Sequence, residues 1–421
     1  MNGKVIFNAD DFGISRGVNA AIKQAHEEGI LNSASIMINQ KYAAEALRLK
    51  EKMPDLELGL HVNLTNEYPA APVDEIPLLV GKDGKFKNGF LKLACLALIK
   101  PKQLKEQVRI EVEAQIKKAL EMGAEIKHID SHRHVHMIPV IFEVFLELKE
   151  KYQIGRIRVM NECGLLSALH NKGFSYLLDG GVIKYYLLRF FAMINGYASD
   201  TYFYTMLYTC KLSKNRFANV LVPQEFNAVE VMIHPSLPDI DKNYPEDVFD
   251  ENILSQWRKA ELDTLLDKNI LNNFSFGVAY PFPINIYLKL EKWWFSVPQK
   301  LRFLLVGGFN TVFAYAIFAL LAGLLEIPYL LALIIQYFIT VNISIFTMRY
   351  YVFQSHGNIL REYGKAWLVY IGMFAFNSTA LTLLVELCRM TELVGQALYL
   401  TVSTILTYLL HKYFSFCKKI K

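Results

Sequence analysis

The chain has 421 residues, a formal net charge of +5 and 53% hydrophobic residues. It is too long for one ordinary domain, and this hydrophobic fraction is high for a wholly soluble protein. The small charge gives no reason to expect a nucleic-acid partner, and we expect none. Five scattered cysteines form no metal-binding spacing and agree with a reducing compartment.

The first predicted strand ends in two carboxylates. Residues 4–12 are mainly apolar, as in a buried strand, and Asp10 and Asp11 come just before Gly13, where glycine lets the backbone turn sharply. In α/β barrels and open α/β sheets, chemistry lies at that end of a strand. Because side chains alternate along a strand, both carboxylates can serve one cavity only if the chain bends there. A solvated turn is the alternative interpretation.

Two later apolar segments end in residues that suit metal binding. Residues 56–64 contain His61, and residues 126–136 hold four of the ten histidines within nine positions. Imidazole and carboxylate together suit a divalent ion such as zinc, whose three protein ligands leave a position open for water or substrate. One aspartate together with His61 and His132 would fill those three places.

The other histidines of these segments admit several roles. His128 alternates with Asp130 along one predicted strand, so it either faces the same cavity or orients a ligand from behind. His134 and His136 are expected to orient ligands or to contact substrate. A further predicted strand ends in His234, which could supply a general acid.

These segments resemble the YdjC-like carbohydrate deacetylases, the group that includes chitooligosaccharide deacetylase. The resemblance covers roughly residues 1 to 280 and keeps the order of the motifs. It is carried by Asn8-Ala9-Asp10-Asp11-Phe12-Gly13, the strand that ends in His61, Asp130-Ser131-His132-Arg133-His134-Val135-His136 and Glu230-Val231-Met232-Ile233-His234-Pro235.

The resemblance implies a distorted (β/α) TIM-like barrel that holds a divalent metal ion and removes acetyl from an N-acetylated sugar. By motif position it places the metal ligands at Asp11, His61 and His132, the general base at Asp10 and a catalytic histidine at His234. The chemistry agrees, because amide carbonyls are poor electrophiles, neutral water is a poor nucleophile, and zinc or magnesium would help both. We expect Asp10 to take the proton of the attacking water and His234 to protonate the departing amine.

After Pro281 and Pro283 the pattern changes from that of a globular α/β protein to long apolar stretches. Four of these stretches, near 304–325, 329–346, 366–387 and 393–410, are each about long enough to span a bilayer. We therefore predict a deacetylase domain at 1–285, an interfacial linker at 286–300 and an all-α domain of four transmembrane helices at 301–418.

Basic residues flank the predicted spans unevenly. Ten positive charges lie on one side of the membrane and only Arg389 on the other, so both termini are expected in the cytoplasm. No signal peptide precedes the first strand, and the catalytic domain is expected to remain where it is made. These features predict a multi-pass protein of the cytoplasmic membrane.

The membrane half contains an internal repeat and carries a second resemblance. Phe309-Asn310-Thr311 is echoed by Phe376-Asn377-Ser378, as expected for two duplicated hairpins. The segment Arg302-Phe303-Leu304-Leu305-Val306-Gly307-Gly308 and the motif that follows it resemble the GtrA-like family of four-span proteins, over about residues 300–418. That family is linked to polyprenyl-phosphate sugars and to their translocation.

Polar residues within the predicted spans either line a path for a lipid headgroup or join neighbouring helices. They are Asn310, Gln336, Asn342 and Asn377. Arg349 and Lys412, at the cytoplasmic ends of the second and fourth spans, are candidates for contact with a lipid phosphate. Anchoring by the positive-inside rule is the simpler explanation for both.

Two apolar segments of the first half, 90–99 and 182–194, are too short to span a bilayer. They could lie on a membrane surface, form a lid over the sugar site or belong to the core.

Together these patterns predict a metal-dependent N-deacetylase of an amino sugar carried on a polyprenyl phosphate or diphosphate, with coupling to translocation of that lipid as a further expectation. One alternative is a flippase whose barrel only binds the headgroup. Another is a deacetylase of soluble oligosaccharides with a membrane anchor. The expected partners are the lipid-linked sugar, membrane lipid and further copies of the chain.

Overall fold

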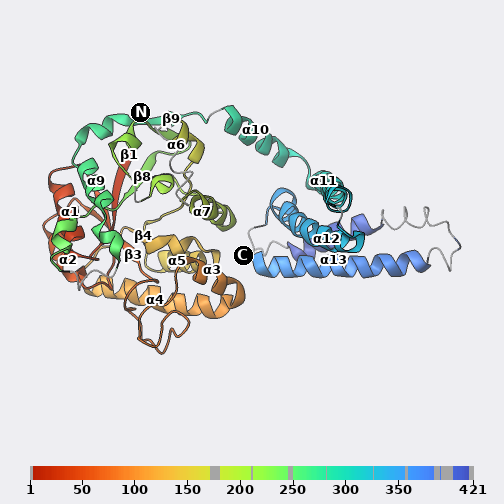
Figure 1. Cartoon of the computed structure of the whole chain (residues 1–421), viewed down its shortest axis with the longest axis horizontal. Coiled ribbons are helices and arrows are strands. Elements are labelled where there is room, and N and C mark those ends of the chain that lie inside the picture. Colours follow the sequence, from red (N-terminus) through yellow and green to blue (C-terminus); the bar gives the residue numbers. More distant parts are fainter. Residues whose placement is uncertain are drawn as a thin grey trace. The chain divides into compact units, whose positions relative to one another are not determined.

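The computed structural model divides into two units, Met1–Pro281 and Phe282–Lys421 (Figure 1). It describes residues 3–170, 181–209, 212–244, 250–280, 282–325, 327–355, 359–383, 389 and 402–416. Each unit has its own cluster of buried apolar side chains.

The first unit is built on a parallel sheet of seven strands in the order β5-β4-β3-β2-β1-β8-β6. Their bounds are β1 Lys4–Phe12, β2 Ser33–Ile36, β3 Glu57–Val62, β4 His128–Ser131, β5 Arg156–Ile157, β6 Thr201–Tyr204 and β8 Ala228–Ile233. A separate parallel pair joins β7 (Val220–Pro223) to β9 (Phe274–Val278). The large sheet curls into half a barrel with helices around it, which confirms the predicted distorted TIM-like fold.

Helices surround the sheet of this unit (Figure 1). They are α1 Arg16–Glu27, α2 Ala43–Glu51, α3 Phe90–Ile99, α4 Pro101–Glu121, α5 Pro139–Lys151, α6 Gly164–His170, α7 Gly181–Asn195, α8 Pro238–Asp241 and α9 Gln256–Leu265. Helix α4 shows why the sequence folds this way. Leu104, Val108, Val112 and Ile116 recur every fourth residue and are buried along one face, while charged side chains cover the other.

Parallel pairing brings the carboxyl ends of β1, β3, β4 and β8 to one edge of the sheet. Asp10 and Asp11 lie near the end of β1, His61 lies near the end of β3, and His132 and His234 directly follow β4 and β8. The predicted site residues therefore share one edge, as in other parallel α/β folds.

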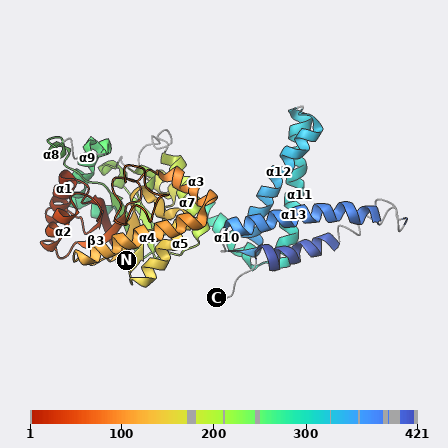
Figure 2. The same cartoon turned by 90° about the horizontal axis from the view of Figure 1, so that it is seen from below.

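The second unit is helical (Figure 2). Its helices are α10 Phe282–Ser296, α11 Gln299–Phe318, α12 Tyr329–Thr347 and α13 Ile359–Thr382, with further helical residues at 402–410. Two helical stretches, Gln299–Leu324 and Leu331–Phe353, are long and apolar enough to cross a membrane. They coincide with the first two predicted spans. The third and fourth predicted spans extend over residues outside the described part of the chain.

Polar side chains tie the long helices of the second unit together. The Nδ2 of Asn310 donates to the Oγ of Ser344 at 2.9 Å and to the Oγ1 of Thr347 at 3.1 Å, and Ser344 is 2.6 Å from the Tyr370 hydroxyl. These bonds join α11, α12 and α13, which favours the helix-packing interpretation of Asn310. Tyr363 on α13 likewise bonds Asn342, whereas Gln336 bonds Thr340 on its own helix. The side chain of Asn377 is outside the described set.

Arg349 and Lys412 differ in their surroundings. Arg349 is 1% exposed, and its Nε lies 2.8 Å from the Oε2 of Glu362. Lys412 is partly exposed and its ammonium lies over the rings of Tyr408 and Tyr413. The ion pair gives Arg349 a structural role, and contact of either residue with a lipid phosphate stays a prediction.

Candidate active site

The carboxyl end of β1 bends at the two aspartates. The pairing register between β1 and β2 shifts between Ala9 and Phe12, and Asp11 has a φ of 67°. A residue with a side chain seldom adopts this left-handed conformation, and such strain gathers at functional sites. The shift interrupts the alternation of side chains, so both Asp10 and Asp11 face one cavity. This is the bend that a shared site requires.

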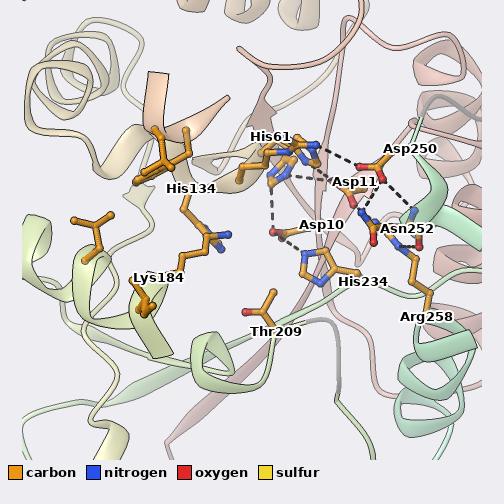
Figure 3. A pocket seen from close by; sticks show the side chains of 16 residues that line it. Asp10, Asp11, His61, His134, Lys184, Thr209, His234, Asp250, Asn252 and Arg258 are labelled. Carbon is orange, nitrogen blue, oxygen red and sulfur yellow. Dashed lines mark hydrogen bonds and ion pairs between the residues drawn. The ribbon is translucent and has the colours of Figure 1, made fainter. Parts of the chain in front are cut away.

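The cavity at this edge of the sheet has a volume of about 540 Å³. Figure 3 shows Asp10, Asp11, His61 and His234 facing the same space, with His134 and Lys184 on the opposite wall. Helices α3 and α7 supply the apolar part of the lining, which consists of Phe90, Leu91, Ile183 and Leu187. The size and mixed polarity suit a small ligand such as a sugar.

Asp11, His61 and His132 form a buried group that could hold a metal ion. One ligand atom from each lies within 4.8 Å of the others. The Oδ1 of Asp11 is 3.0 Å from the Nδ1 of His132 and 3.5 Å from the Nε2 of His61. Burial would raise the pKa of Asp11, but Arg258 and His132 outweigh burial and hold it well below its usual range. A carboxylate and two imidazoles fit a divalent ion.

A second buried group, formed by Asp10, His61 and Asp130, has comparable spacing. Here the carboxylates are already occupied by Arg158. Its Nη1 and Nη2 donate to both oxygens of Asp10 at 2.7 Å, and its Nη2 lies 2.7 Å from the Oδ2 of Asp130. This guanidinium compensates the two charges. The group that contains Asp11 is therefore the better candidate for a metal ion.

Neighbouring polar groups fix the orientation of the candidate ligands. The Nδ1 of His61 lies 2.6 Å from the Oδ1 of Asp130, so a proton on Nδ1 leaves the Nε2 lone pair facing Asp11. Arg258 donates to the Oδ2 of Asp11 at 2.7 Å, which leaves Oδ1 for the histidines. The Nδ2 of Asn66 lies 3.1 Å from the Nε2 of His132. This contact leaves the Nδ1 of His132 facing Asp11.

Asp10 and His234 lie next to each other, beside the group of Asp11, His61 and His132. The Nε2 of His234 is 3.9 Å from the Oδ2 of Asp10, the oxygen that also lies 4.0 Å from the Nδ1 of His61. Behind His234, the Oε2 of Glu261 accepts the backbone N–H of residue 234 and lies 3.7 Å from its Nδ1. The carboxylate of Glu261 thus holds the loop that presents His234 to the cavity.

The remaining predicted histidines divide between the cavity and the layer behind it. His134 lines the cavity, is 3% exposed and has no hydrogen-bond partner at Nδ1 among the described residues. Burial, Lys184 and Arg158 hold the pKa of His134 well below its usual value, so its imidazole is neutral.

His128 and His136 do not line the cavity. The Nε2 of His128 lies 3.0 Å from the Oγ of Ser35, which donates to Asp130. The Nδ1 of His136 lies 2.7 Å from the Oγ of Ser131, and its Nε2 lies 3.1 Å from the carbonyl oxygen of Arg158. These contacts favour the orienting role for both, and their contact with substrate stays a prediction.

Three charged residues of the site escaped the sequence patterns. Arg158 directly follows β5, so the strand-end rule that identified His61 could also have singled it out. Arg258 and Glu261 lie on α9, three residues apart, in a helix with no motif. Only the fold brings that helix beside Asp11 and His234.

The fold and the site define a class of protein, a parallel α/β half-barrel that holds a carboxylate and two imidazoles at its strand ends. Residues 4–274 match the YdjC-like protein family, and residues 302–416 match the GtrA/DPMS transmembrane domain. The chain belongs to the YdjC-like protein family. Both resemblances noted in the sequence are thereby confirmed.

Several relatives are named as deacetylases. The carbohydrate deacetylase of Thermoanaerobacter pseudethanolicus is 32% identical over 267 residues, covering 63% of this chain and 92% of the relative. That of Brevibacillus brevis is 34% identical and covers 42% of this chain and 70% of the relative. The chitooligosaccharide deacetylase of Proteus mirabilis is 34% identical, and the match covers 35% of this chain and 55% of the relative. A solved structure from Enterococcus faecalis V583 aligns with a TM-score of 0.47 at 23% identity, over 65% of this chain and 94% of its own.

Proposed function

We infer that the chain is a carbohydrate deacetylase, a hydrolase that cleaves the amide of an N-acetylated amino sugar. The observation that carries this inference is the buried group of Asp11, His61 and His132 beside Asp10 and His234, in a chain of the YdjC-like family. Its relatives are named for the same reaction on carbohydrates. The GtrA-like domain makes this a membrane-associated deacetylase.

Metal dependence is part of the proposal. Asp11, His61 and His132 would hold a divalent ion, zinc or magnesium, through one carboxylate oxygen and two imidazole nitrogens. Bound there, the ion would supply Lewis acidity towards the acetyl carbonyl and would acidify water. Two contacts support this assignment. Arg258 occupies the Oδ2 of Asp11 and Asp130 occupies the Nδ1 of His61, so the remaining donor atom of each residue points to the group.

Asp10 and His234 would manage the protons of the reaction. Arg158 fixes the carboxylate of Asp10 by two hydrogen bonds. The Oδ2 of Asp10 faces the cavity, where it would accept the proton of an attacking water. His234 would protonate the amine as the C–N bond breaks. His134 presents a neutral imidazole to the cavity, which suits a hydrogen bond with a sugar hydroxyl or acetamido group.

Glu261 allows the role of His234 to be tested without removing the imidazole. In a Glu261→Gln variant we expect kcat on a free N-acetylated disaccharide to fall about 10- to 100-fold, because general acid catalysis of this order depends on orientation. We expect KM to stay within about twofold and the basic limb of the pH profile, where a general acid loses its proton, to move to lower pH. The matched control is Asp263→Asn on the same helix, whose exposed carboxylate pairs with Lys259 at the surface. Equal kinetics for the two variants would contradict the role of Glu261.

We further propose that the substrate is carried on a polyprenyl phosphate or diphosphate and that the catalytic unit works at the cytoplasmic face of the membrane. Support comes from the second unit, which matches a domain shared by GtrA proteins and contains two helices long enough to span a bilayer. A protein tethered to the bilayer samples a thin layer of headgroups at high effective concentration. Coupling to translocation, and a homo-oligomer, would extend this proposal.

The lipid-linked substrate can be tested by comparing two acetyl donors. With the full chain in lipid vesicles, we expect acetate release from a polyprenyl-diphosphate N-acetyl sugar to exceed release from the free N-acetyl sugar by at least about tenfold at equal concentration. Mass spectrometry of the lipid follows loss of the acetyl group. Equal rates would remove the lipid from the proposal and leave a deacetylase of soluble sugars. Binding of the lipid with no acetate released would instead favour a flippase.

A further inference from the structure

Helices α3 and α7 carry large apolar side chains on their outer faces. On α3, Leu91 is 71% exposed and Ile99 is 73% exposed, and on α7, Ile183 is 75% and Tyr186 is 67% exposed. The inner faces of the same helices are buried through residues such as Leu93 and Leu188. Each helix is therefore apolar on two sides, and only one side is used by the core of the unit.

The exposed residues form continuous stripes. Positions 91, 95, 98 and 99 share one face of α3, and positions 183, 186, 190 and 193 share one face of α7. The two helices lie side by side (Figures 1 and 2), and the rings of Phe90 and Phe191 stack at a centroid distance of 6.2 Å. Large contiguous apolar patches of this kind mark interaction sites on soluble domains.

We propose that these outer faces form a membrane-docking surface, consisting of Leu91, Leu98 and Ile99 on α3 and Ile183, Tyr186 and Phe190 on α7. The helices are 10 and 15 residues long, too short to span a bilayer, and suit an interfacial position instead. Neither contains an aspartate or glutamate, and their charges are Lys92, Lys184 and Arg189. Positive charge beside apolar side chains complements an anionic lipid surface.

The charge and the rest of the chain distinguish a bilayer from a second protein copy. A two-fold dimer through this face would place like charges opposite one another, which opposes association. A bilayer, by contrast, is always within reach, because the same chain carries the membrane unit.

The docking surface continues into the catalytic cavity. Leu91 of α3 and Ile183, Lys184 and Leu187 of α7 line that cavity. Docking would therefore set the mouth of the site on the headgroup layer. This consequence rests on the proposed lipid-linked substrate, because such a sugar could then reach Asp10 with its lipid tail still in the bilayer. The docking itself does not depend on the substrate.

Lipid quenching of a label at Cys95, which lies exposed within the α3 stripe, tests the proposal directly. In full-length protein with the other four cysteines replaced by serine, we expect an NBD label at Cys95 to be quenched several-fold more by doxyl lipids than by aqueous iodide. The vesicles contain phosphatidylcholine and phosphatidylglycerol and no substrate. The matched control carries the label at Leu120→Cys, at the end of α4, with Cys95 also replaced.

Equal doxyl quenching at the two positions would overturn the proposal, and so would a Cys95 label shielded from both quenchers, which would indicate a covering protein. In the same background, the double variant Ile99→Glu with Tyr186→Glu should lower quenching at Cys95 to the control level without lowering the thermal midpoint. Persistent quenching in that variant would also overturn it. Neither residue lines the cavity.

Activity measurements separate this inference from the proposed function. Acetate release from a vesicle-borne lipid-linked sugar should fall about tenfold in the double variant, while release from the free sugar stays unchanged. Quenching at Cys95 without turnover of lipid-linked sugar would defeat only the proposed substrate. Turnover of that substrate without quenching would defeat only the docking surface.

Discussion

Replacement of His61 by alanine is expected to abolish both metal content and acetate release. The imidazole supplies one of three donor atoms, and Asp130 holds it in place, because Asp130 lies 2.6 Å from its Nδ1 and the Nε2 is thereby directed to Asp11. We expect metal content to fall from about one ion per chain to near zero and kcat/KM to fall at least about a thousandfold. Asp11→Ala and His132→Ala should behave alike.

Elemental analysis of purified protein and an acetate assay measure the two effects together. His26→Ala is the matched control, since His26 lies on α1, away from the site, and its Nδ1 is 2.8 Å from the carbonyl oxygen of Leu31. The control should keep its metal and its activity. Variants of the three-residue group that retain full turnover after exhaustive chelation would show that the metal hypothesis is wrong.

Replacement of Arg158 by methionine is expected to lower the thermal stability of the first unit strongly. Its guanidinium is buried and contacts Asp10, Asp130 and Glu230, all of them buried. Methionine fills a similar volume but removes the guanidinium charge that all three carboxylates share. Breaking a buried charge pair in this way costs about 3 to 5 kcal/mol. For a unit of this size, that lowers the unfolding midpoint by about 10 °C.

Calorimetry of the full chain in one detergent can compare this variant with Arg109→Met. Arg109 lies on α4 and pairs with Glu106 and Glu147 at the surface. Exposed pairs of this kind contribute under about 1 kcal/mol, so the control midpoint should hardly move. A midpoint for Arg158→Met that matches the control would mean that the carboxylate cluster does not need this charge.

Most of the proposed catalytic group could be predicted because its members sit at strand ends. Asp10, Asp11, His61 and His234 each follow an apolar run, and parallel pairing gathers such ends at one edge whatever the rest of the chain does. Glu261 could not be found this way. Its relation to His234 depends on where α9 packs, and helix packing leaves no short motif in the sequence.

The histidines between residues 128 and 136 show the same limit. Their density indicated a site, but their spacing could not say which of them face the cavity. After β4 the chain does not continue as a strand, because Arg133 and His134 both have a φ of 58°. That turn puts His134 in the cavity wall and His136 behind it, against Ser131. Alternation along a strand gives no guide beyond the point where the strand ends.

The sequence by itself determined the parallel α/β unit, the helical membrane unit and the family, because these follow from local periodicity, apolar length and motif order. Only the tertiary structure decided how Asp10 and Asp11 share one cavity, through the left-handed conformation at Asp11. It also decided that α3 and α7 expose one apolar face beside the site. Both depend on contacts between segments far apart in the chain, and an apolar helix has the same local pattern whether its outer face meets protein, lipid or water.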